Sequence, residues 1–470
     1  MRLLRKSLAA ADDARRGAAL LLAFLVLIVI IAIVYQINTV TLTDERITYN
    51  EITRSQMDLS IEAVLLQTYE DLKEDALAAQ ASQGDGASGA ATGGPGGPQD
   101  PGSGAPPDGE AGEPPRNPDA VDSMMDRWYT PQSTNFGDVQ IRIFIRDENS
   151  KYNVLNMLDP DEEQAEIAFQ RVVRVLDNAR GGTDYDISNG DAEEMARAMR
   201  DYMQTRYGSE LPTPELLTSD QENEDRVVPF TFAEFRALEP FEDNMFEDFF
   251  TEDDQRIHAI SSYLTVFTSP SVGAEEVGSG LPSGGGGFGV NVNTAPHAVL
   301  TALFDSREID YRVWDEIREY RNQEEEPMES EEDEGLEDVE PEPLLDEYGN
   351  EVLPTQIFDA LDELDELYEF DALNETEKAS IRDALEVTSD VFEIVLAARI
   401  STAADADQRV EFQSRREQEE YFRSGEHIVR IIRSVVWRRP GDEDVAIVPL
   451  VRWEVLENAP LKILDFPDED

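Results

Sequence analysis

The chain has 470 residues and carries 101 Asp and Glu against 39 Lys and Arg, which gives a formal net charge of −62. This charge argues against nucleic acid as a partner, because proteins bind a phosphate backbone by neutralising it with Lys and Arg. The sequence contains no Cys, which excludes thiol catalysis, cysteine-type zinc sites and disulfides. Its three His are far apart in the sequence, which disfavours a His-based triad or metal cage.

The N-terminal region predicts a membrane anchor. Residues 1–17 are basic, and an unbroken apolar run follows from 18 to 35. At about 1.5 Å per residue, a helix over 18–37 approaches the roughly 30 Å hydrocarbon core of a bilayer, so we expect it to span the membrane. The residues at 34–36, Val-Tyr-Gln, do not supply the cleavage pattern of a secretory signal peptide. Basic residues before the helix and acidic ones after it predict a cytoplasmic N-terminus and a periplasmic body.

The helix is expected to continue beyond the membrane as an amphipathic segment over 38–83. The segment has no Pro or Gly up to about residue 80, and one helical face carries Met57, Ile61, Leu65, Thr68 and Leu72 at spacings of three and four residues. We therefore expect one rod, half embedded in lipid and half packed on a soluble domain.

Two segments have the composition of linkers. Residues 84–120 consist mostly of Gly, Pro and Ser with few apolar side chains, so we expect a flexible linker. Residues 324–350 carry a block of acidic side chains that repel one another, which predicts an acidic disordered tract. Because this tract holds much of the excess charge, the folded core is expected to be less acidic than the total suggests.

The soluble part changes character along the chain in a way that predicts an α+β fold. Period-two alternation over 139–146 indicates a strand, so we interpret 121–160 as the first strand region of the domain. Residues 161–323 are interpreted as an inserted helical domain and 351–388 as a further helical segment. The C-terminal strands are assigned to 389–470, over 391–400, 428–437 and 445–455.

Start and stop residues predict the helices of the insert. Thr294 is expected to cap one of them, with Pro296 in its first turn. The expected helices cover 163–180, 191–207, 232–238, 294–304 and 311–321.

Four segments carry a resemblance to a known family. Residues 15–34 resemble the N-terminus of a type IV prepilin-like protein, with a basic leader, Gly17 before the scissile bond and a hydrophobic helix. Three further segments resemble general secretion pathway protein K, the large minor pseudopilin of type II secretion. They are IRIFIRDENSKYNVLNML at 141–158, SYLTVF at 262–267 and FGVNVNTAPHAVLTALF at 288–304. The most specific part is the motif Asn291-Val292-Asn293-Thr294-Ala295-Pro296.

The resemblance implies a fold and a set of partners. The fold would be pilin-like, with the long N-terminal helix packed on a small antiparallel sheet and a large helical insert. A prepilin peptidase would cut between Gly17 and Ala18. The mature protein would remain in the inner membrane with its body in the periplasm, and would join I-type and J-type minor pseudopilins and the major pseudopilin. Its implied function is to cap the pseudopilus tip and to help initiate pseudopilus assembly for protein export across the outer membrane.

Leu22 is the fifth residue counted from Ala18, where major pilin-like subunits carry a Glu that pairs with a neighbouring N-terminal amine. A carboxylate in an apolar filament core costs several kcal/mol unless it is paired, so its absence is interpreted as the mark of a tip position, where no such partner exists. The alternative is that Leu22 is an ordinary apolar residue of a single-pass anchor.

Calcium is a possible ligand, since the inserts of some relatives bind it. Asp184, Asp186 and Asp191, with Ser188 among them, place several oxygen ligands on a short loop in an order partly like an EF-hand. However, Asn189 occupies the sixth position, where Gly is expected. The alternative is a polar loop between helices whose acidic residues lie near a helix N-terminus, which the helix dipole favours. No cofactor is otherwise indicated.

No arrangement of residues indicates catalysis, because paired carboxylates are uninformative in so acidic a chain and no Ser-His-Asp spacing is recognisable. We therefore expect a protein that is not an enzyme. A second class of function stays open: a single-pass, membrane-anchored acidic periplasmic binding protein that is not part of a filament.

Overall fold

The computed structural model describes residues 2–87, 121–137, 139–159, 161–207, 231–251, 255–267, 289–322, 356–401, 427–440 and 445–456. Apart from 84–87, the predicted linkers at 84–120 and 324–350 lie outside the described residues. The chain divides into two units, Met1–Ser60 and Ile61–Asp470.

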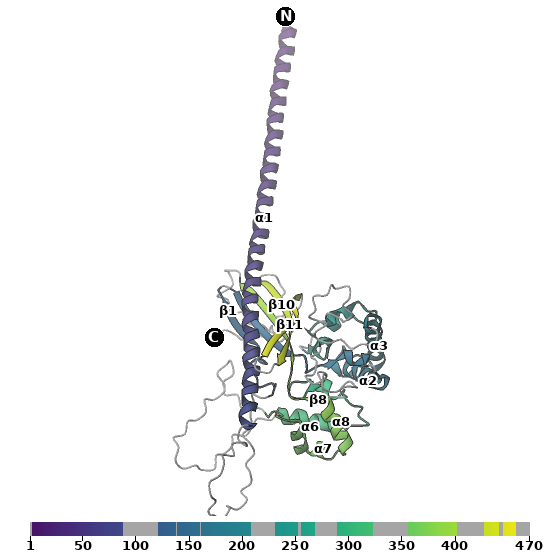
Figure 1. The fold of residues 1–470 in the computed structure, drawn as a ribbon. Coiled ribbons are helices and arrows are strands. Elements are labelled where there is room, and N and C mark those ends of the chain that lie inside the picture. Colours follow the sequence, from purple (N-terminus) through teal and green to yellow (C-terminus); the bar gives the residue numbers. More distant parts are fainter. Residues whose placement is uncertain are drawn as a thin grey trace, which may run out of the picture. The chain divides into compact units, whose positions relative to one another are not determined.

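One helix, α1, runs without a break from Arg2 to Ala87 (Figure 1). Within it, Phe24–Leu77 contains an 18-residue window with a mean hydropathy of 2.4, and none of that window is buried. Among the described residues, this is the one helix long and apolar enough to cross a membrane. Beyond residue 60 the helix is amphipathic as predicted, because Ile61, Leu65, Thr68 and Leu72 are buried while most of the residues between them are exposed.

A sheet of five strands forms the centre of the second unit. Its strand order is β1-β2-β9-β10-β11, and every neighbouring pair is antiparallel. In the central pair, Asp147 lies opposite Phe392 and Ile141 opposite Ala398. The strands are β1 Gln132–Phe136, β2 Val139–Asp147, β9 Val391–Ser401, β10 His427–Pro440 and β11 Val445–Leu456.

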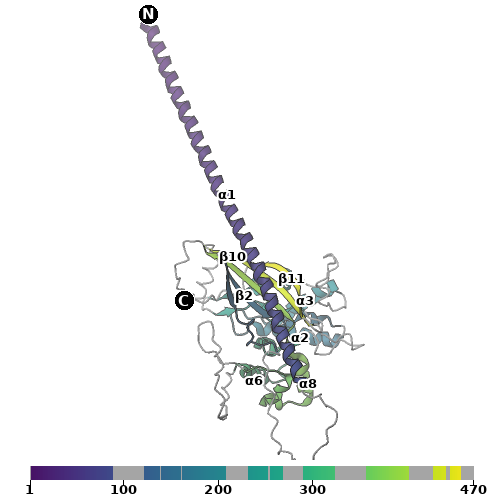
Figure 2. The ribbon, with the colours of Figure 1, turned by 60° about the vertical axis from the view of Figure 1, so that its left-hand side comes forward.

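The C-terminal turns of α1 cover one face of this sheet, as the two ribbon views show (Figure 2). The hydroxyl of Tyr69 lies 2.8 Å from that of Ser434 on β10. Further along the helix, Asp75 accepts a hydrogen bond of 3.0 Å from the guanidinium of Arg438. Because successive side chains alternate across a strand, the even-numbered residues of β10 face the helix.

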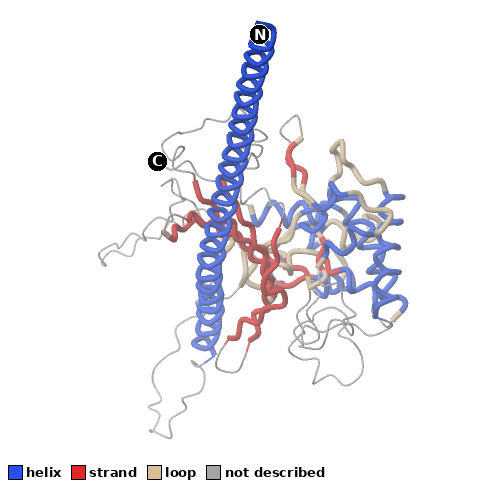
Figure 3. Tube along the Cα trace, turned by 90° about the horizontal axis from the view of Figure 1, so that it is seen from above, coloured by secondary structure: helices blue, strands red, loops and turns tan. Residues whose placement is uncertain are grey.

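The opposite face of the sheet meets the insert. Trp437, next to Arg438 in β10, is 3% exposed and belongs to the same core as the helices of the insert. On β2, Arg146 donates to the hydroxyl of Ser262 in the insert at 3.2 Å. Seen from above, the strands therefore lie between the part of α1 beyond residue 60 and the insert helices (Figure 3).

The insert occupies residues 148–390, between two strands that pair directly with each other. Its helices are α2 Glu162–Ala179, α3 Asn189–Tyr207, α5 His297–Leu300, α6 Tyr311–Arg321, α7 Tyr368–Asp371 and α8 Glu375–Ala384. Its 3-10 helices are η3 Val154–Leu158, η5 Phe232–Ala237, η6 Asp243–Phe246, η7 Ile260–Ser262 and η8 Leu361–Glu366. Three pairs of two-residue strands complete it: β3 Tyr152–Asn153 with β6 Leu264–Thr265, β4 Phe249–Phe250 with β5 Arg256–Ile257, and β7 Val290–Asn291 with β8 Leu385–Glu386.

One hydrophobic core joins the parts of the insert. Phe169 of α2 and Met199 of α3 belong to it, and so do Phe358, Phe370 and Ile381 from the predicted helical segment at 351–388. That segment therefore packs with the helices of 161–323, although the acidic tract separates them in the sequence.

Most predicted helix ends agree with the structure. Asp161 caps α2 with its side chain, and Gly182, just beyond the C-terminus of α2, has a φ of +76°, which favours glycine. The helix predicted over 311–321 has those bounds and is capped by Asp310.

The fold class is confirmed as α+β, with a long apolar N-terminal helix and an antiparallel sheet. One expected helix is wrong in its extent. The segment predicted as helical over 294–304 contains only His297–Leu300 in α-helical conformation, with Pro296 as its cap residue.

We predict that Arg438→Met lowers the free energy of unfolding by about 3–5 kcal/mol, because it leaves the buried carboxylate of Asp122 without its cation. Asp122 is 4% exposed and accepts bonds of 2.8 and 2.6 Å from Arg438. Chemical denaturation of the full chain in detergent micelles measures the change. The matched control is Arg439→Met, which removes an exposed cation from the next position of β10 and should cost about 1 kcal/mol or less. Equal losses for both variants would contradict the prediction.

Candidate functional site

The Asn-Val-Asn-Thr-Ala-Pro motif lies at the junction between the sheet and the insert. Asn291, which is fully buried, donates from its amide to the carbonyl of Asp122 at 3.0 Å and to the hydroxyl of Ser389 at 2.8 Å. Its side-chain oxygen accepts from the N–H of Asn293 at 2.9 Å. One side chain thus connects the segment before β1, the middle of the insert and the start of β9.

Asn293 forms hydrogen bonds with the segment that follows the acidic tract. Its side-chain amide donates to the carbonyl of Phe358 at 3.0 Å, and its oxygen accepts from the N–H of the same residue at 2.9 Å. Because both groups of Phe358 are buried, only a side chain with a donor and an acceptor in this geometry satisfies them.

The prediction that Thr294 caps a helix is wrong. Its hydroxyl donates instead to Asp147 at 2.5 Å, and the hydroxyl of Ser389 donates to the same carboxylate oxygen at 2.6 Å. The other oxygen accepts from the N–H of Asn149 at 2.7 Å. Burial raises the pKa of Asp147 to about 6, and these three donors oppose that rise.

Glu386 of β8 extends the network. Its carboxyl accepts a bond of 2.6 Å from the side-chain amide of Asn149. Burial raises its pKa to about 8, and the charges of Asp390 and Asp147 act in the same direction. The backbone of Gly289 passes so close that a Cβ there would lie 3.0 Å from the Glu386 carboxyl, so any other residue would have to displace this side chain slightly.

A second cluster of carboxylates lies around Arg438. Its guanidinium donates to both oxygens of Asp122 and, at 2.7 Å, to the carbonyl of Ser389. Asp126 lies nearby, and burial raises its pKa to about 8, assisted by the charges of Asp122 and Asp75.

A third cluster lies on the sheet face that meets the insert. Glu393 of β9 accepts a bond of 2.5 Å from Arg146 and lies 3.6 Å from the ammonium of Lys151 and 3.4 Å from Arg433. Burial alone would raise the pKa of Glu393, but these three cations hold it well below its usual range. Glu148 pairs with the same Lys151, so two carboxylates balance most of the positive charge.

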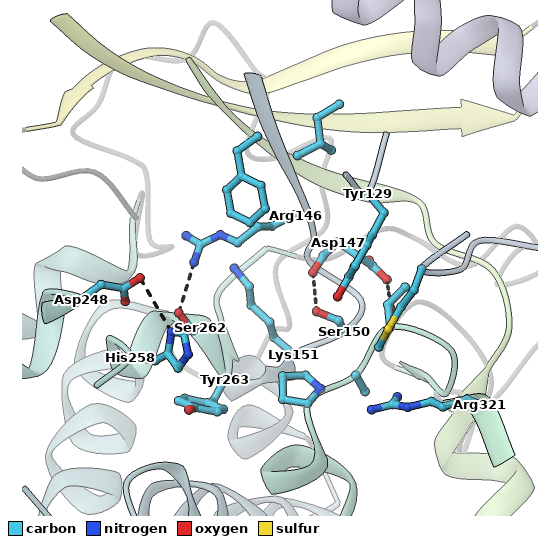
Figure 4. A pocket seen from close by; sticks show the side chains of 16 residues that line it. Tyr129, Arg146, Asp147, Ser150, Lys151, Asp248, His258, Ser262, Tyr263 and Arg321 are labelled. Carbon is cyan, nitrogen blue, oxygen red and sulfur yellow. Dashed lines mark hydrogen bonds and ion pairs between the residues drawn. The ribbon is translucent and has the colours of Figure 1, made fainter. Parts of the chain in front are cut away.

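A cavity of about 290 Å³ opens between these clusters (Figure 4). Its charged lining consists of Arg146, Lys151, Arg321, Asp147 and Asp248. Its remaining lining residues are Met124, Tyr129, Phe144, Ile145, Ser150, His258, Ser262, Tyr263, Thr294, Ala295 and Pro296. The last three belong to the motif, so the motif both holds the junction together and forms part of the cavity wall.

The cavity contains one Asp-His pair. Nδ1 of His258 lies 3.8 Å from Asp248, beyond hydrogen-bonding distance. Asp248 accepts instead from the N–H of Ala259 at 2.7 Å. Ser262, the nearby hydroxyl, accepts from Arg146. The arrangement orders the wall of the cavity and gives no nucleophile with a base in contact.

The predicted processing and tip residues lie in α1. Gly17, Ala18 and Leu22 are in its helical part within the first unit, far in sequence from the junction. Their roles stay predictions.

The residues predicted to bind calcium are found in two settings. Asp184 and Asp186 lie in the loop between α2 and α3, whereas Asp191 is in the first turn of α3, which begins at Asn189. The hydroxyl of Ser188 donates to Asp191 at 2.7 Å. This contact agrees with the alternative interpretation, in which the acidic residues lie near a helix N-terminus. Within the described part of the chain, no three acidic or His side chains are grouped as a metal ion requires. The calcium site stays a prediction.

Comparison with known proteins finds similarity in structure and none in sequence. No protein-family model matches the chain, and no curated protein matches it. A crystal structure of the GspK-GspI-GspJ complex from the type 2 secretion system of enterotoxigenic Escherichia coli is similar at 11% identity, with a TM-score of 0.39. The similarity covers 72% of this chain and 88% of the matched chain. At this level of similarity, the function must be argued from the chain itself.

Several residues of the junction were missed in the sequence. A charge inside an otherwise apolar strand was the available signal for Glu393 and Arg433. Arg146 stands at a polar position of an alternating strand, and Arg438 lies beside Arg439 at the end of its strand, so neither gave such a signal. Strand patterns identify the first two positions but do not say which charges meet.

We predict that Glu386→Gln reduces the pH dependence of stability. The carboxyl titrates near 4.3 in an unfolded chain but at about 8 in the folded protein. Between these values the folded state holds a proton that the unfolded state has lost, so stability falls as the pH rises through this window. The neutral amide of Gln cannot lose that proton, so the variant should lose less stability between pH 5 and pH 8, as urea denaturation at several pH values measures.

Asp147 and Asp126 also have raised pKa values and act in the same direction, so part of the slope should remain in the variant. Glu194→Gln is the control, since Glu194 is exposed on α3. It should leave the slope unchanged. A Glu386→Gln variant with the slope of the unmodified protein would show that this carboxyl is ionised in the folded state.

Proposed function

We propose that the protein is a minor pseudopilin of a type II secretion system. In this role it caps the tip of the pseudopilus and helps to initiate its assembly for protein export across the outer membrane. The observation that carries the proposal is α1, a single helix from Arg2 to Ala87 whose apolar part is exposed and whose C-terminal turns pack on an antiparallel sheet. The prepilin-like leader and the motif at 291–296 support it.

The proposed mechanism is mechanical and assigns no catalytic step. The basic leader and the apolar helix insert the preprotein in the inner membrane, with its body in the periplasm, and a prepilin peptidase cuts between Gly17 and Ala18. The apolar surface of α1 then packs against the corresponding helices of I-type and J-type minor pseudopilins and of the major pseudopilin. Calcium binding by the insert is not needed for this mechanism.

The tip position rests on two features. Leu22 provides no carboxylate to pair with a neighbouring amine inside the filament core. The insert at 148–390 adds a helical body to one face of the sheet, which would obstruct the stacking of another subunit above it.

Processing is the direct test of this proposal. When the chain is produced with a prepilin peptidase, we expect intact-mass measurement to show loss of the residues through Gly17, and Gly17→Leu should prevent it. Ala10→Leu is the control, because it makes a similar change within the leader, away from the scissile bond. An unprocessed N-terminus in the native host would falsify the proposal and favour the alternative, a membrane-anchored periplasmic binding protein outside any filament.

The tip position predicts a low abundance in filaments. Immunogold labelling of sheared filaments should place the protein at filament ends, and its deletion should prevent filaments from starting. The major pseudopilin, labelled in the same preparation, serves as the control for antibody access. Labelling along the shaft at the abundance of the major subunit would contradict the tip position while leaving the pseudopilin class intact.

A further inference from the structure

The cavity at the junction is lined by three cations and two carboxylates, although the chain as a whole is strongly acidic. Arg146, Lys151 and Arg321 reach it from β2, from the turn that follows β2 and from the end of α6 (Figure 4). The long-range field of the acidic chain is screened over about 8–10 Å at physiological salt. The groups that line the cavity therefore decide what it binds.

Two of the three cations already have counter-ions. Arg146 pairs with Glu393, and Lys151 pairs with both Glu148 and Glu393. The two carboxylates of the cavity wall are also engaged, since Asp147 accepts three hydrogen bonds and Asp248 accepts from the N–H of Ala259.

Arg321 differs from these groups. It is 7% exposed, and its guanidinium donates at 2.8 Å to the carbonyl of Val292. Its Nε has no acceptor, and no carboxylate forms an ion pair with it in the described part of the chain. Burial lowers its pKa to about 10. The nearby Tyr129 opposes this shift, and the charge of Arg318 on the same helix adds to it. A cation buried without a counter-ion is unfavourable, so the site is suited to an anion.

The wall of the cavity limits the kind of anion. Met124, Phe144, Ile145 and Pro296 provide apolar surface, and a volume of about 290 Å³ is at the lower end of the range for small-molecule sites. Among the cations of the lining, Arg321 is the one without ion-pair contact to a carboxylate of the described residues, and its planar array of donors matches a carboxylate.

We propose that this cavity binds a small organic monocarboxylate, whose carboxylate pairs with Arg321 and whose apolar part contacts the sheet residues of the wall. This binding site does not depend on membership of a filament. A ligand there would contact β2, the motif at 294–296 and α6 together, so it would stabilise the junction.

The test uses benzoate as the probe and the full chain in detergent micelles, with benzamide as the uncharged counterpart. Calorimetric titration gives the affinity, and the melting temperature reports stabilisation of the folded state. Arg321→Met removes the charge and keeps most of the side-chain volume. The matched control is Arg318→Met, which removes a half-exposed cation one turn earlier in α6, where it pairs with Asp315.

We expect benzoate to bind and to raise the melting temperature of the unmodified protein and of Arg318→Met. Arg321→Met should bind benzoate about tenfold more weakly or worse, and benzamide should bind none of the proteins with comparable affinity. Arg321→Lys keeps the charge and should retain part of the affinity. If the Met variant folds poorly, the Lys variant still tests whether the charge binds benzoate. The proposal would be overturned by absence of benzoate binding, by equal affinities for benzoate and benzamide, or by unchanged affinity in Arg321→Met.

Discussion

The carboxylate of Asp147 is the interaction on which the rest of the structure depends. It ends β2, where the chain leaves the sheet, and it binds donors from three places: the N–H of Asn149 at the start of the insert, Thr294 in its middle and Ser389 at its end. Each donor belongs to a different segment, so one buried group brings together the exit, the centre and the return of the insert. A side chain without acceptors at this position would deprive the Thr294 hydroxyl and the Asn149 N–H of this acceptor, and would leave the Ser389 hydroxyl with only its bond from Asn291.

This constraint follows from where the insert is placed. Because β2 and β9 are hydrogen-bonded neighbours, the 148–390 segment leaves and rejoins the sheet at adjacent positions, and its own core can form without altering the register of the strands. The insert also packs on the sheet, because Val435 and Trp437 of β10 belong to the same hydrophobic core as its helices. Apolar contacts are not directional, whereas the paired bonds between Asn293 and Phe358 fix both distance and angle. The polar motif is thus a structural element of the fold.

The sequence predicted the elements that depend on local pattern, and it did not predict the contacts that depend on distant partners. The helix at 311–321 was predicted to the residue because its apolar periodicity and its ends are local features. β1 was missed because Gln-Ser-Thr-Asn-Phe is a polar, mostly exposed edge strand without the alternation that burial imposes. Thr294 was assigned to a helix cap because its type and spacing fit one, and its actual acceptor, Asp147, is remote in sequence. The cavity was not predictable because Arg146, Lys151 and Arg321 come together only when the insert packs on the sheet.

Arg438 connects the two faces of the sheet. It binds Asp75 on α1 through one nitrogen and Asp122 with the Ser389 carbonyl through the other. Ser389 in turn donates to Asp147, so a continuous series of polar contacts, buried from Arg438 onward, leads from the helix through the sheet to the insert. Such contacts hold their geometry because each group that moved would lose a partner where water cannot replace it. A displacement of the C-terminal turns of α1 against the sheet would therefore act directly on the junction and on the cavity that the junction encloses.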